Sequence, residues 1–177
     1  MSQTMQIRSY IDIHSHMLPA VDDGSDSTET SIAMLRISEQ EGAKAVILTP
    51  HFYYGRNRYQ QGELQKRFER LQEAVSEARI GLELYLGNEI LWFDEAVEAV
   101  RDGEALCLAG SRSMLIEFYP DTAYQTIERA VRRVVQAGYL PVLAHYERYR
   151  CFHDSREGQE RIEEIREQGA SLQMNFN

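Results

Sequence analysis

The chain has 177 residues, 43% of them hydrophobic and 27% charged, which is ordinary for one globular domain with a sizeable core. Its net charge of −9 argues against a general nucleic-acid or membrane-surface binder, because both need a basic face. An anionic substrate is not excluded, since bound metal ions can reverse the local field. No run approaches the roughly 18 apolar residues of a membrane span, and the N-terminal stretch lacks the apolar segment of a signal peptide.

Short apolar runs alternate with amphipathic helical segments along the chain. The sequence predicts strands at residues 10–14, 45–49, 82–86, 114–118, 140–144 and 170–174. It predicts helices at residues 27–41, 63–78, 94–100, 124–137 and 159–168. Asp26 and Glu29 have capping-box spacing at the start of the first helix, and residues 52–61 are expected to form a loop. This alternation predicts βαβ units with parallel pairing, hence a single α/β domain over residues 1–177.

Metal-ligating side chains recur where the predicted strands give way to loops. The residues concerned are His14, His16, His51, Glu89, Glu117 and His145. Histidines and carboxylates gathered at the C-terminal ends of parallel strands are how a βα-barrel builds an active site. Nitrogen and oxygen ligands without thiolate suit manganese, iron or zinc. Such metals activate water and polarise a phosphoryl oxygen, so the pattern predicts a metal-dependent enzyme.

Taken singly, these positions differ in what they indicate. His14 and His16 point the same way in a strand and can share a metal, although a structural pair is an equal alternative. A lone histidine such as His51 is more often a surface residue, and an exposed carboxylate at Glu89 would be unremarkable. Glu117 is more telling, because it lies inside an apolar run and burying a lone carboxylate is costly.

Several other side chains could contribute chemistry. Asp23 is either a turn residue or a general acid or ligand. Arg148 is either a solvated loop cation or a fork that grips a phosphate. Cys107 and Cys151 lack CxxC spacing and are expected to be free thiols in a reducing compartment. The loop after the second strand could contact an aromatic phosphoester or be plain surface; it carries Tyr53, Tyr54, Arg56, Arg58 and Tyr59.

Together these segments resemble a known family. The stretch Ile11–Pro19, followed by Val21–Gly24, looks like the opening motif of the bacterial PHP-type (polymerase and histidinol phosphatase) protein-tyrosine phosphatases. These are the manganese-dependent enzymes of capsule and exopolysaccharide loci. Later motifs match in the same order, at residues 49–51, 87–90, 115–118 and 144–148. The resemblance covers essentially the whole chain.

The resemblance implies a distorted TIM-like βα-barrel of the PHP type, in the cytoplasm, with a trinuclear metal site. It implies hydrolysis of phosphotyrosine on the tail of a bacterial tyrosine autokinase, which would regulate polysaccharide assembly. Arg148 would bind the phosphate, Asp23 is the candidate acid, and a metal-activated water would attack directly without a phosphocysteine intermediate. Two or three ions are expected, manganese first with iron or zinc as alternatives. The implied ligands are His14, His16, His51, Glu89 (bridging), Glu117 and His145.

Two departures from the family pattern bear on these expectations. Tyr146 stands where the strand-five motif has proline, which is expected to loosen the loop that carries Arg148. The family completes its metal site with a late Asp-x-His motif that this sequence lacks, so the C-terminal part of the barrel is expected to be missing from residues 1–177. Two alternatives to a phosphotyrosine phosphatase remain: a PHP phosphoesterase acting on a small, histidinol-phosphate-like monoester, and an inactive, truncated relative that binds a kinase tail or partner. No nucleic-acid partner or membrane insertion is expected, and homo-oligomerisation is left open.

Overall fold

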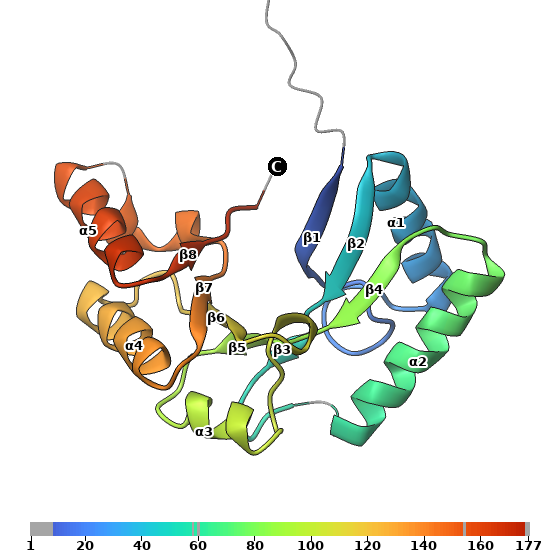
Figure 1. Cartoon of the computed structure of the whole chain (residues 1–177), viewed down its shortest axis with the longest axis horizontal. Coiled ribbons are helices and arrows are strands. Elements are labelled where there is room, and N and C mark those ends of the chain that lie inside the picture. Colours follow the sequence, from blue (N-terminus) through green and yellow to red (C-terminus); the bar gives the residue numbers. More distant parts are fainter. Residues whose placement is uncertain (1–8, 58, 60, 154, 176–177) are drawn as a thin grey trace, which may run out of the picture. The chain divides into compact units, whose positions relative to one another are not determined.

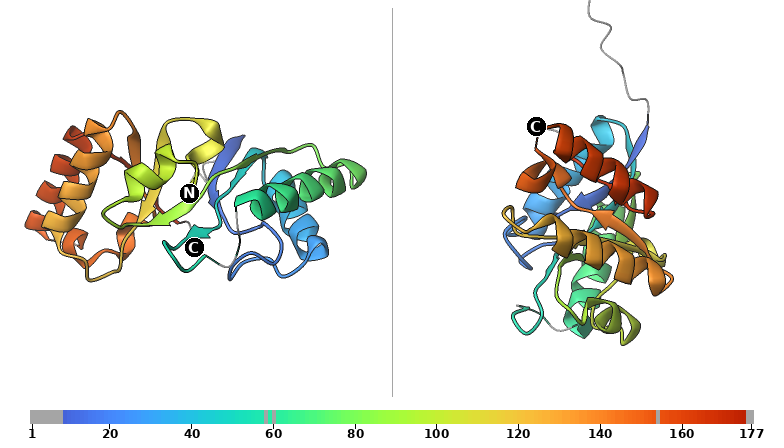
Figure 2. Two further views of the ribbon diagram at one scale, coloured as in Figure 1. Left: turned by 90° about the horizontal axis from the view of Figure 1, so that it is seen from below. Right: turned by 90° about the vertical axis from the view of Figure 1, so that its left-hand side faces the viewer.

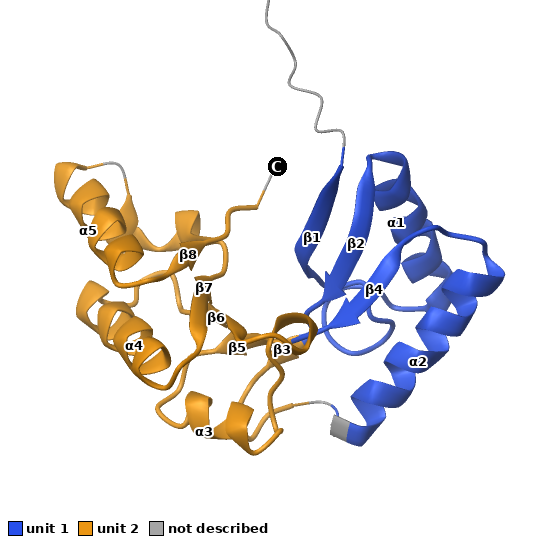
Figure 3. Cartoon of the chain, viewed as in Figure 1, with its two compact units in different colours: residues 1–50, 58–87 blue, residues 51–57, 88–177 orange. Residues whose placement is uncertain are grey.

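The chain divides into two compact units, shown in Figure 3. The computed structural model describes residues 9–57, 59, 61–153 and 155–175. Unit 1 comprises residues 1–50 and 58–87, and unit 2 comprises residues 51–57 and 88–177. No helix in the described ranges is both long enough and apolar enough to cross a membrane.

Unit 1 is a small parallel sheet with helices on one face. Its elements, in chain order, are β1 (Tyr10–Ser15), α1 (Thr28–Gln40), β2 (Ala43–Leu48), α2 (Gln61–Glu77) and β4 (Glu83–Leu86). The strand order is β1-β2-β4, and both neighbouring pairs are parallel. Helices α1 and α2 lie side by side against this sheet (Figure 1). Each helix carries the chain back to the end of the sheet where the strands begin, so that the next strand can run parallel to the previous one.

Helix α1 is capped by a different residue from the one predicted. Ser27 is its N-cap, and the Ser27 hydroxyl accepts a hydrogen bond from the backbone N–H of Thr30 at 3.1 Å. The Asp26 carboxylate instead accepts from the Thr30 hydroxyl at 2.7 Å. The predicted capping box of Asp26 and Glu29 is therefore wrong. Two adjacent residues could cap this turn, and the extended backbone at Ser27 aims its hydroxyl at the free N–H.

Unit 2 is a parallel sheet whose described strands follow the order β3-β5-β6-β7-β8. Its strands and helices, in chain order, are β3 (His51–Phe52), β5 (Glu89–Leu91), α3 (Ala96–Arg101), β6 (Ser113–Glu117), α4 (Tyr124–Gln136), β7 (Leu140–Leu143), α5 (Arg156–Glu167) and β8 (Ser171–Leu172). Helices α4 and α5 lie next to each other in all the views of Figures 1 and 2. The prediction of an α/β fold with parallel strands is confirmed, whereas closure into a barrel stays a prediction.

Two of the predicted strands are each followed, after a short break, by a further strand that was not predicted and that belongs to the other sheet. Strand β2 stops before Pro50 and the chain continues as β3, while β4 stops before Asn88 and continues as β5. The buried Asn88 exchanges hydrogen bonds with Leu106 through its backbone N–H and its side-chain oxygen. His51 and Glu89 consequently begin short strands instead of following the ends of long ones. The predicted loop 52–61 was correspondingly wrong at both ends, since it starts in β3 and ends in α2.

The core of unit 2 gathers around Tyr149, which is fully buried. Its hydroxyl donates to the carbonyl of Ala144 at 2.7 Å and accepts from the backbone N–H of Phe118 at 3.2 Å. Ala144 precedes His145 and Phe118 follows Glu117, so one side chain fixes the backbone beside two predicted ligands. Burial raises the pKa of Tyr149 well above its ordinary range, which keeps the hydroxyl protonated and able to donate.

Replacing Tyr149 by phenylalanine should lower the free energy of unfolding by about 1–3 kcal/mol, because two buried backbone groups lose their partner. Urea unfolding followed by circular dichroism measures the change. Tyr119→Phe is the matched control, since the Tyr119 side chain is 62% exposed. That substitution should shift stability by less than about 0.5 kcal/mol. Equal stability of the two variants would show that the Tyr149 hydroxyl does not brace the core.

Candidate metal centre

Four of the predicted ligands form one cluster within unit 2. His51 comes from β3, Glu89 from β5 and Glu117 from β6, and His145 lies just beyond the end of β7. His51 Nδ1 lies 3.0 Å from one carboxylate oxygen of Glu89 and 3.0 Å from one of Glu117. His145 Nε2 lies 2.7 Å from the other oxygen of Glu89 and 3.6 Å from Glu117. Each glutamate thus contacts both histidines.

The register of the parallel strands produces this convergence. His51 is aligned with Glu89 across the β3–β5 pair, and Leu91 is aligned with Glu117 across the β5–β6 pair. Glu117 is the last residue of β6, and His145 comes two residues after the end of β7. Glu89 is itself aligned with Leu115, two residues before Glu117. Residues two apart in a strand share a face, so both carboxylates lie on the same face of the sheet and reach the same two histidines.

The electrostatics of the unit 2 cluster favour positive charge. Glu89 is 1% exposed and the Glu117 side chain 12%, so both carboxylates are largely removed from water. Burial alone would lower the pKa of His51, but hydrogen bonds and charge from Glu117 and Glu89 raise it to about 10. The same balance raises the pKa of His145 to about 9. Burial would raise the pKa of Glu117, and its bonds to His145 and His51 outweigh that effect and lower it.

The donor set of this cluster fits a metal ion. Potential ligand atoms of His51, Glu89 and Glu117 all lie within 4.8 Å of one another. Imidazole nitrogens and carboxylate oxygens are ligands for manganese, iron and zinc. A cation held by these atoms would take over the role that protons play in balancing the two buried carboxylates. The structure therefore supplies groups that could hold a metal, while the choice of manganese stays a prediction.

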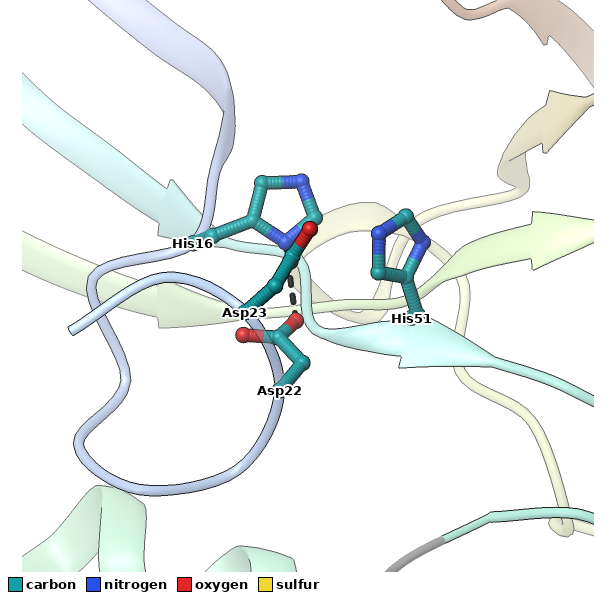
Figure 4. A group of neighbouring side chains, drawn as sticks. All are labelled: His16, Asp22, Asp23 and His51. Carbon is teal, nitrogen blue, oxygen red and sulfur yellow. Dashed lines mark hydrogen bonds and ion pairs between the residues drawn. The ribbon is translucent and has the colours of Figure 1, made fainter. Parts of the chain in front are cut away.

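The remaining predicted ligands gather within unit 1, at the end of β1. The Nε2 atoms of His14 and His16 lie 3.3 Å apart, as the two-residue spacing predicts. His16 Nδ1 lies 2.8 Å from a carboxylate oxygen of Asp22, drawn as a dashed line in Figure 4. Asp23 belongs to the same group, because ligand atoms of His16, Asp22 and Asp23 lie within 4.8 Å of one another. His51, also drawn in Figure 4, is a residue of unit 2.

A tight loop holds Asp22 beside His16. A Cβ atom at Gly24 would lie only 1.9 Å from the His16 carbonyl oxygen, so no residue other than glycine fits there. The backbone N–H of Ser25 closes the loop by donating to the same carbonyl at 2.9 Å. Asp22 was not singled out from the sequence, because an Asp-Asp-Gly turn offers two carboxylates and the pattern does not say which one faces the histidine. Its contact makes it an orienting partner for His16 or a ligand itself.

Arg148, the predicted phosphate-binding residue, ends the 3₁₀ turn Tyr146–Arg148 and is exposed. It lines a pocket of about 530 Å³ together with Glu117, His145 and Arg56. Arg58, the other arginine of the predicted basic loop, lies outside the described residues.

Tyr146 occupies the position of the family proline in the loop that carries Arg148. Its backbone N–H donates to the carbonyl of Gln173 at 3.1 Å. Proline has no N–H and could not make this bond. Tyr146 thus adds a hydrogen bond between the turn and the segment that follows β8, while the looser loop stays a prediction.

Gln173 braces the backbone that carries His145. His145 has left-handed dihedrals (φ 33°, ψ 51°), which are unfavourable for a residue with a side chain. Its N–H donates to the side-chain oxygen of Gln173 at 2.7 Å. The N–H of Gln173 donates to the carbonyl of Leu143 at 2.9 Å, which fixes the other side of the turn. Sequence reasoning missed this role, because a glutamine within the predicted strand at residues 170–174 has no local pattern that marks it as a brace.

A parallel α/β fold with histidine–carboxylate clusters at its strand ends defines a candidate metal-dependent hydrolase. The chain belongs to the CpsB/CapC family, described as capsular polysaccharide synthesis, whose family model matches residues 10–177. The resemblance found in the sequence motifs is thereby confirmed.

The relatives are named tyrosine phosphatases. The chain is 32% identical over 165 residues to tyrosine-protein phosphatase CpsB of Streptococcus pneumoniae, an alignment that covers 93% of this chain and 67% of the relative. It is 31% identical over 164 residues to tyrosine-protein phosphatase YwqE of Bacillus subtilis, covering 93% and 63%. A crystal structure from work on these two proteins, described as unique metal-dependent tyrosine phosphatases, matches with a TM-score of 0.84 at 30% identity and covers 93% of this chain and 66% of that one. The chain thus spans about two thirds of the length of these relatives.

Exchanging Glu117 for glutamine should weaken Mn²⁺ binding by at least about tenfold, because one ligand loses its charge while its shape is kept. Titration calorimetry on the 177-residue chain measures the dissociation constant. Glu104→Gln is the control, since Glu104 is an exposed glutamate of the same unit. If both variants bind Mn²⁺ as tightly as the unchanged chain, Glu117 is not a ligand.

Replacing Gln173 by alanine should lower the free energy of unfolding by about 1–3 kcal/mol, because the buried N–H of His145 loses its acceptor. We also expect weaker Mn²⁺ binding, since His145 loses the contact that holds its backbone in place. Met174→Ala, at the adjacent and exposed side chain, is the control and should change neither quantity. Gln173→Glu keeps an acceptor oxygen and should retain most of the stability. A Gln173→Ala chain with unchanged unfolding and Mn²⁺ affinity would contradict the bracing role.

Proposed function

We propose that this chain carries the catalytic site of a metal-dependent phosphotyrosine-protein phosphatase. The observation that carries the proposal is the cluster in which Glu89 and Glu117 both contact His51 and His145, in a chain of the CpsB/CapC family. We infer two or three metal ions, manganese first with iron or zinc as alternatives. The proposed ligands are His14, His16, His51, Glu89, Glu117 and His145.

The pocket of unit 2 supports a phosphate-hydrolysing role for these residues. Glu117 and His145 belong to both the cluster and the pocket lining, so a phosphate in the pocket reaches the proposed ligands. Arg148 lines the same pocket, and its planar guanidinium can hold two phosphate oxygens at once. Bound metal ions would lower the pKa of a water molecule and polarise the phosphoryl group. Asp23 is the proposed acid that protonates the departing phenolate of tyrosine.

The cysteines are poorly suited to the alternative chemistry of a thiol phosphatase. That chemistry needs a thiolate near neutral pH. Burial raises the pKa of Cys107 to about 11. Burial also raises the pKa of Cys151, despite the opposing charge of Arg161. Direct transfer of the phosphoryl group to water, without a phosphocysteine, is the mechanism that these side chains favour.

The finer expectations of the family resemblance are part of the same proposal. We infer a distorted βα-barrel of the PHP type over a single domain and a cytoplasmic location. The proposed substrate is the phosphotyrosine tail of a bacterial tyrosine kinase, whose dephosphorylation would regulate capsule or exopolysaccharide assembly. Support comes from the names of the relatives and from the family's description as capsular polysaccharide synthesis.

The test is phosphate release from a phosphotyrosine peptide by the 177-residue chain, with Mn²⁺ and with a chelator. We expect Mn²⁺-dependent release that is lost in His145→Ala and kept in the double variant Cys107→Ala, Cys151→Ala. The pneumococcal relative serves as the positive control, and histidinol phosphate as the competing substrate class. Absence of release both by the metal-loaded chain and by a chimera that adds the C-terminal part of the relative, where the relative itself is active, would refute the proposal. Release by the chimera alone would place the last ligands outside residues 1–177, and preferential hydrolysis of histidinol phosphate would favour a small-molecule phosphoesterase.

A further inference from the structure

We propose that the pocket of unit 2 is an aryl-phosphate subsite, in which Trp92 and Tyr54 bind the aromatic ring of the substrate and so discriminate aryl from alkyl phosphate esters. The inference deepens the proposed phosphatase function and rests on it. It assigns the preference for tyrosine to specific side chains, separate from the groups that hold metal or phosphate.

The pocket has the size and lining of a small-molecule site. Its volume of about 530 Å³ lies within the usual range for such sites. Much of its lining is aromatic, contributed by Tyr54, Trp92, Phe93, Phe118 and Tyr119, among others. The Tyr54 and Phe93 rings are stacked with centroids 4.6 Å apart, and the ring centroids of Trp92 and Phe118 are 6.2 Å apart. Aromatic rings contacting one another in this way form a wall against which a further ring can pack.

The aromatic wall directly adjoins the proposed metal ligands. Leu91 of β5 is aligned with Glu117 of β6. Trp92 and Phe118 are the residues that follow these two in the sequence. The backbone N–H of Trp92 donates to the carbonyl of Glu117 at 2.9 Å, which fixes the two segments together. A phosphate at Glu117 and His145 therefore has an aromatic surface beside it. A phosphotyrosyl group combines a phosphate and a ring at one-bond separation, whereas phosphoserine has no ring to place there.

Two arginines give this pocket the charge that an aryl phosphate requires. Arg56 and Arg148 both line it, in a chain whose net charge is −9. Neither guanidinium forms an ion pair or side-chain hydrogen bond with any residue that the structure describes. The backbone N–H of Arg148 donates to the carbonyl of His145 at 2.9 Å, which places this arginine next to the cluster. Positive charge and aromatic surface in one pocket match a phosphate dianion on an aromatic ring.

Exposure of the aromatic side chains agrees with a binding role. Tyr54 is 58% exposed and Tyr119 62% exposed. Large aromatic surfaces left open to water at one pocket mark a place where a ligand packs. An alkyl phosphate would leave these surfaces uncovered. The ring of an aryl phosphate would cover them, and this difference is the basis of the expected selectivity.

The test compares two phosphonates that cannot be hydrolysed, phenylphosphonate and methylphosphonate, on the chain loaded with Mn²⁺. Trp92 is the only tryptophan of the chain, so its fluorescence reports binding directly. We expect phenylphosphonate to bind roughly tenfold more tightly than methylphosphonate, and to shift the Trp92 emission. In Trp92→Ala and Tyr54→Ala, measured by calorimetry, the preference should largely disappear while the affinities for methylphosphonate and Mn²⁺ stay unchanged. Trp92→Phe keeps a ring and should keep most of the preference.

Kinetics give a second measurement with a matched control. Trp92 contacts the substrate ring equally in the ground state and in the transition state. Trp92→Ala should therefore raise KM for a phosphotyrosine peptide with little change in kcat. Tyr85→Ala removes a partly exposed tyrosine from β4 of unit 1 and should have no effect. The inference is overturned if the unchanged chain binds both phosphonates equally, or if the preference survives in both alanine variants. A phenylphosphonate preference without any phosphotyrosine hydrolysis would support the subsite and refute the proposed phosphatase function.

Discussion

The convergence of two buried carboxylates is the constraint on which the architecture of unit 2 depends. Glu89 and Glu117 come from adjacent strands and share the same two histidine partners. An uncompensated buried charge costs several kcal/mol, whereas one hydrogen bond contributes about 1 kcal/mol. No single contact can therefore hold the two carboxylates together. The two carboxylates need positive charge between them and a rigid backbone that keeps them from moving apart. Stability alone would not select such a cluster.

The surrounding fold supplies that rigid backbone from three directions. The break at Asn88 lets the chain leave one sheet and start β5 in another, which puts Glu89 at the first position of a new strand. Tyr149 links the segments after β6 and β7 through its hydroxyl. Gln173 holds the left-handed turn at His145. Each of these side chains gives hydrogen-bond partners to backbone groups that would otherwise be buried and unpaired. These hydrogen bonds offset the unfavourable free energy of the left-handed turn and of the strand breaks.

The sequence predicts what is local and misses what depends on pairing at long range. The alternation of apolar runs and amphipathic helices was enough to predict the parallel α/β fold, and Glu117 stood out because a carboxylate interrupted an apolar run. No pattern around Pro50 or Asn88 indicates that the chain passes from one sheet to the other there, so this change of sheet could not be predicted. No local pattern reveals the roles of Asp22, Tyr149 and Gln173. Their roles arise from contacts with His16, Ala144 and His145, which only the folded chain brings together.

An acidic chain that captures a phosphate dianion has to reverse its own field. The carboxylates of Glu89 and Glu117 would repel the substrate as long as nothing positive lies between them, and the chain as a whole carries a charge of −9. Arg56 and Arg148 act at the pocket, but exposed arginines are screened by water and salt. Apolar binding of a ring is not screened. On the proposed function, an aromatic wall next to the cluster would therefore let an acidic protein hold tyrosyl phosphate, where an alkyl phosphate would depend on charge alone.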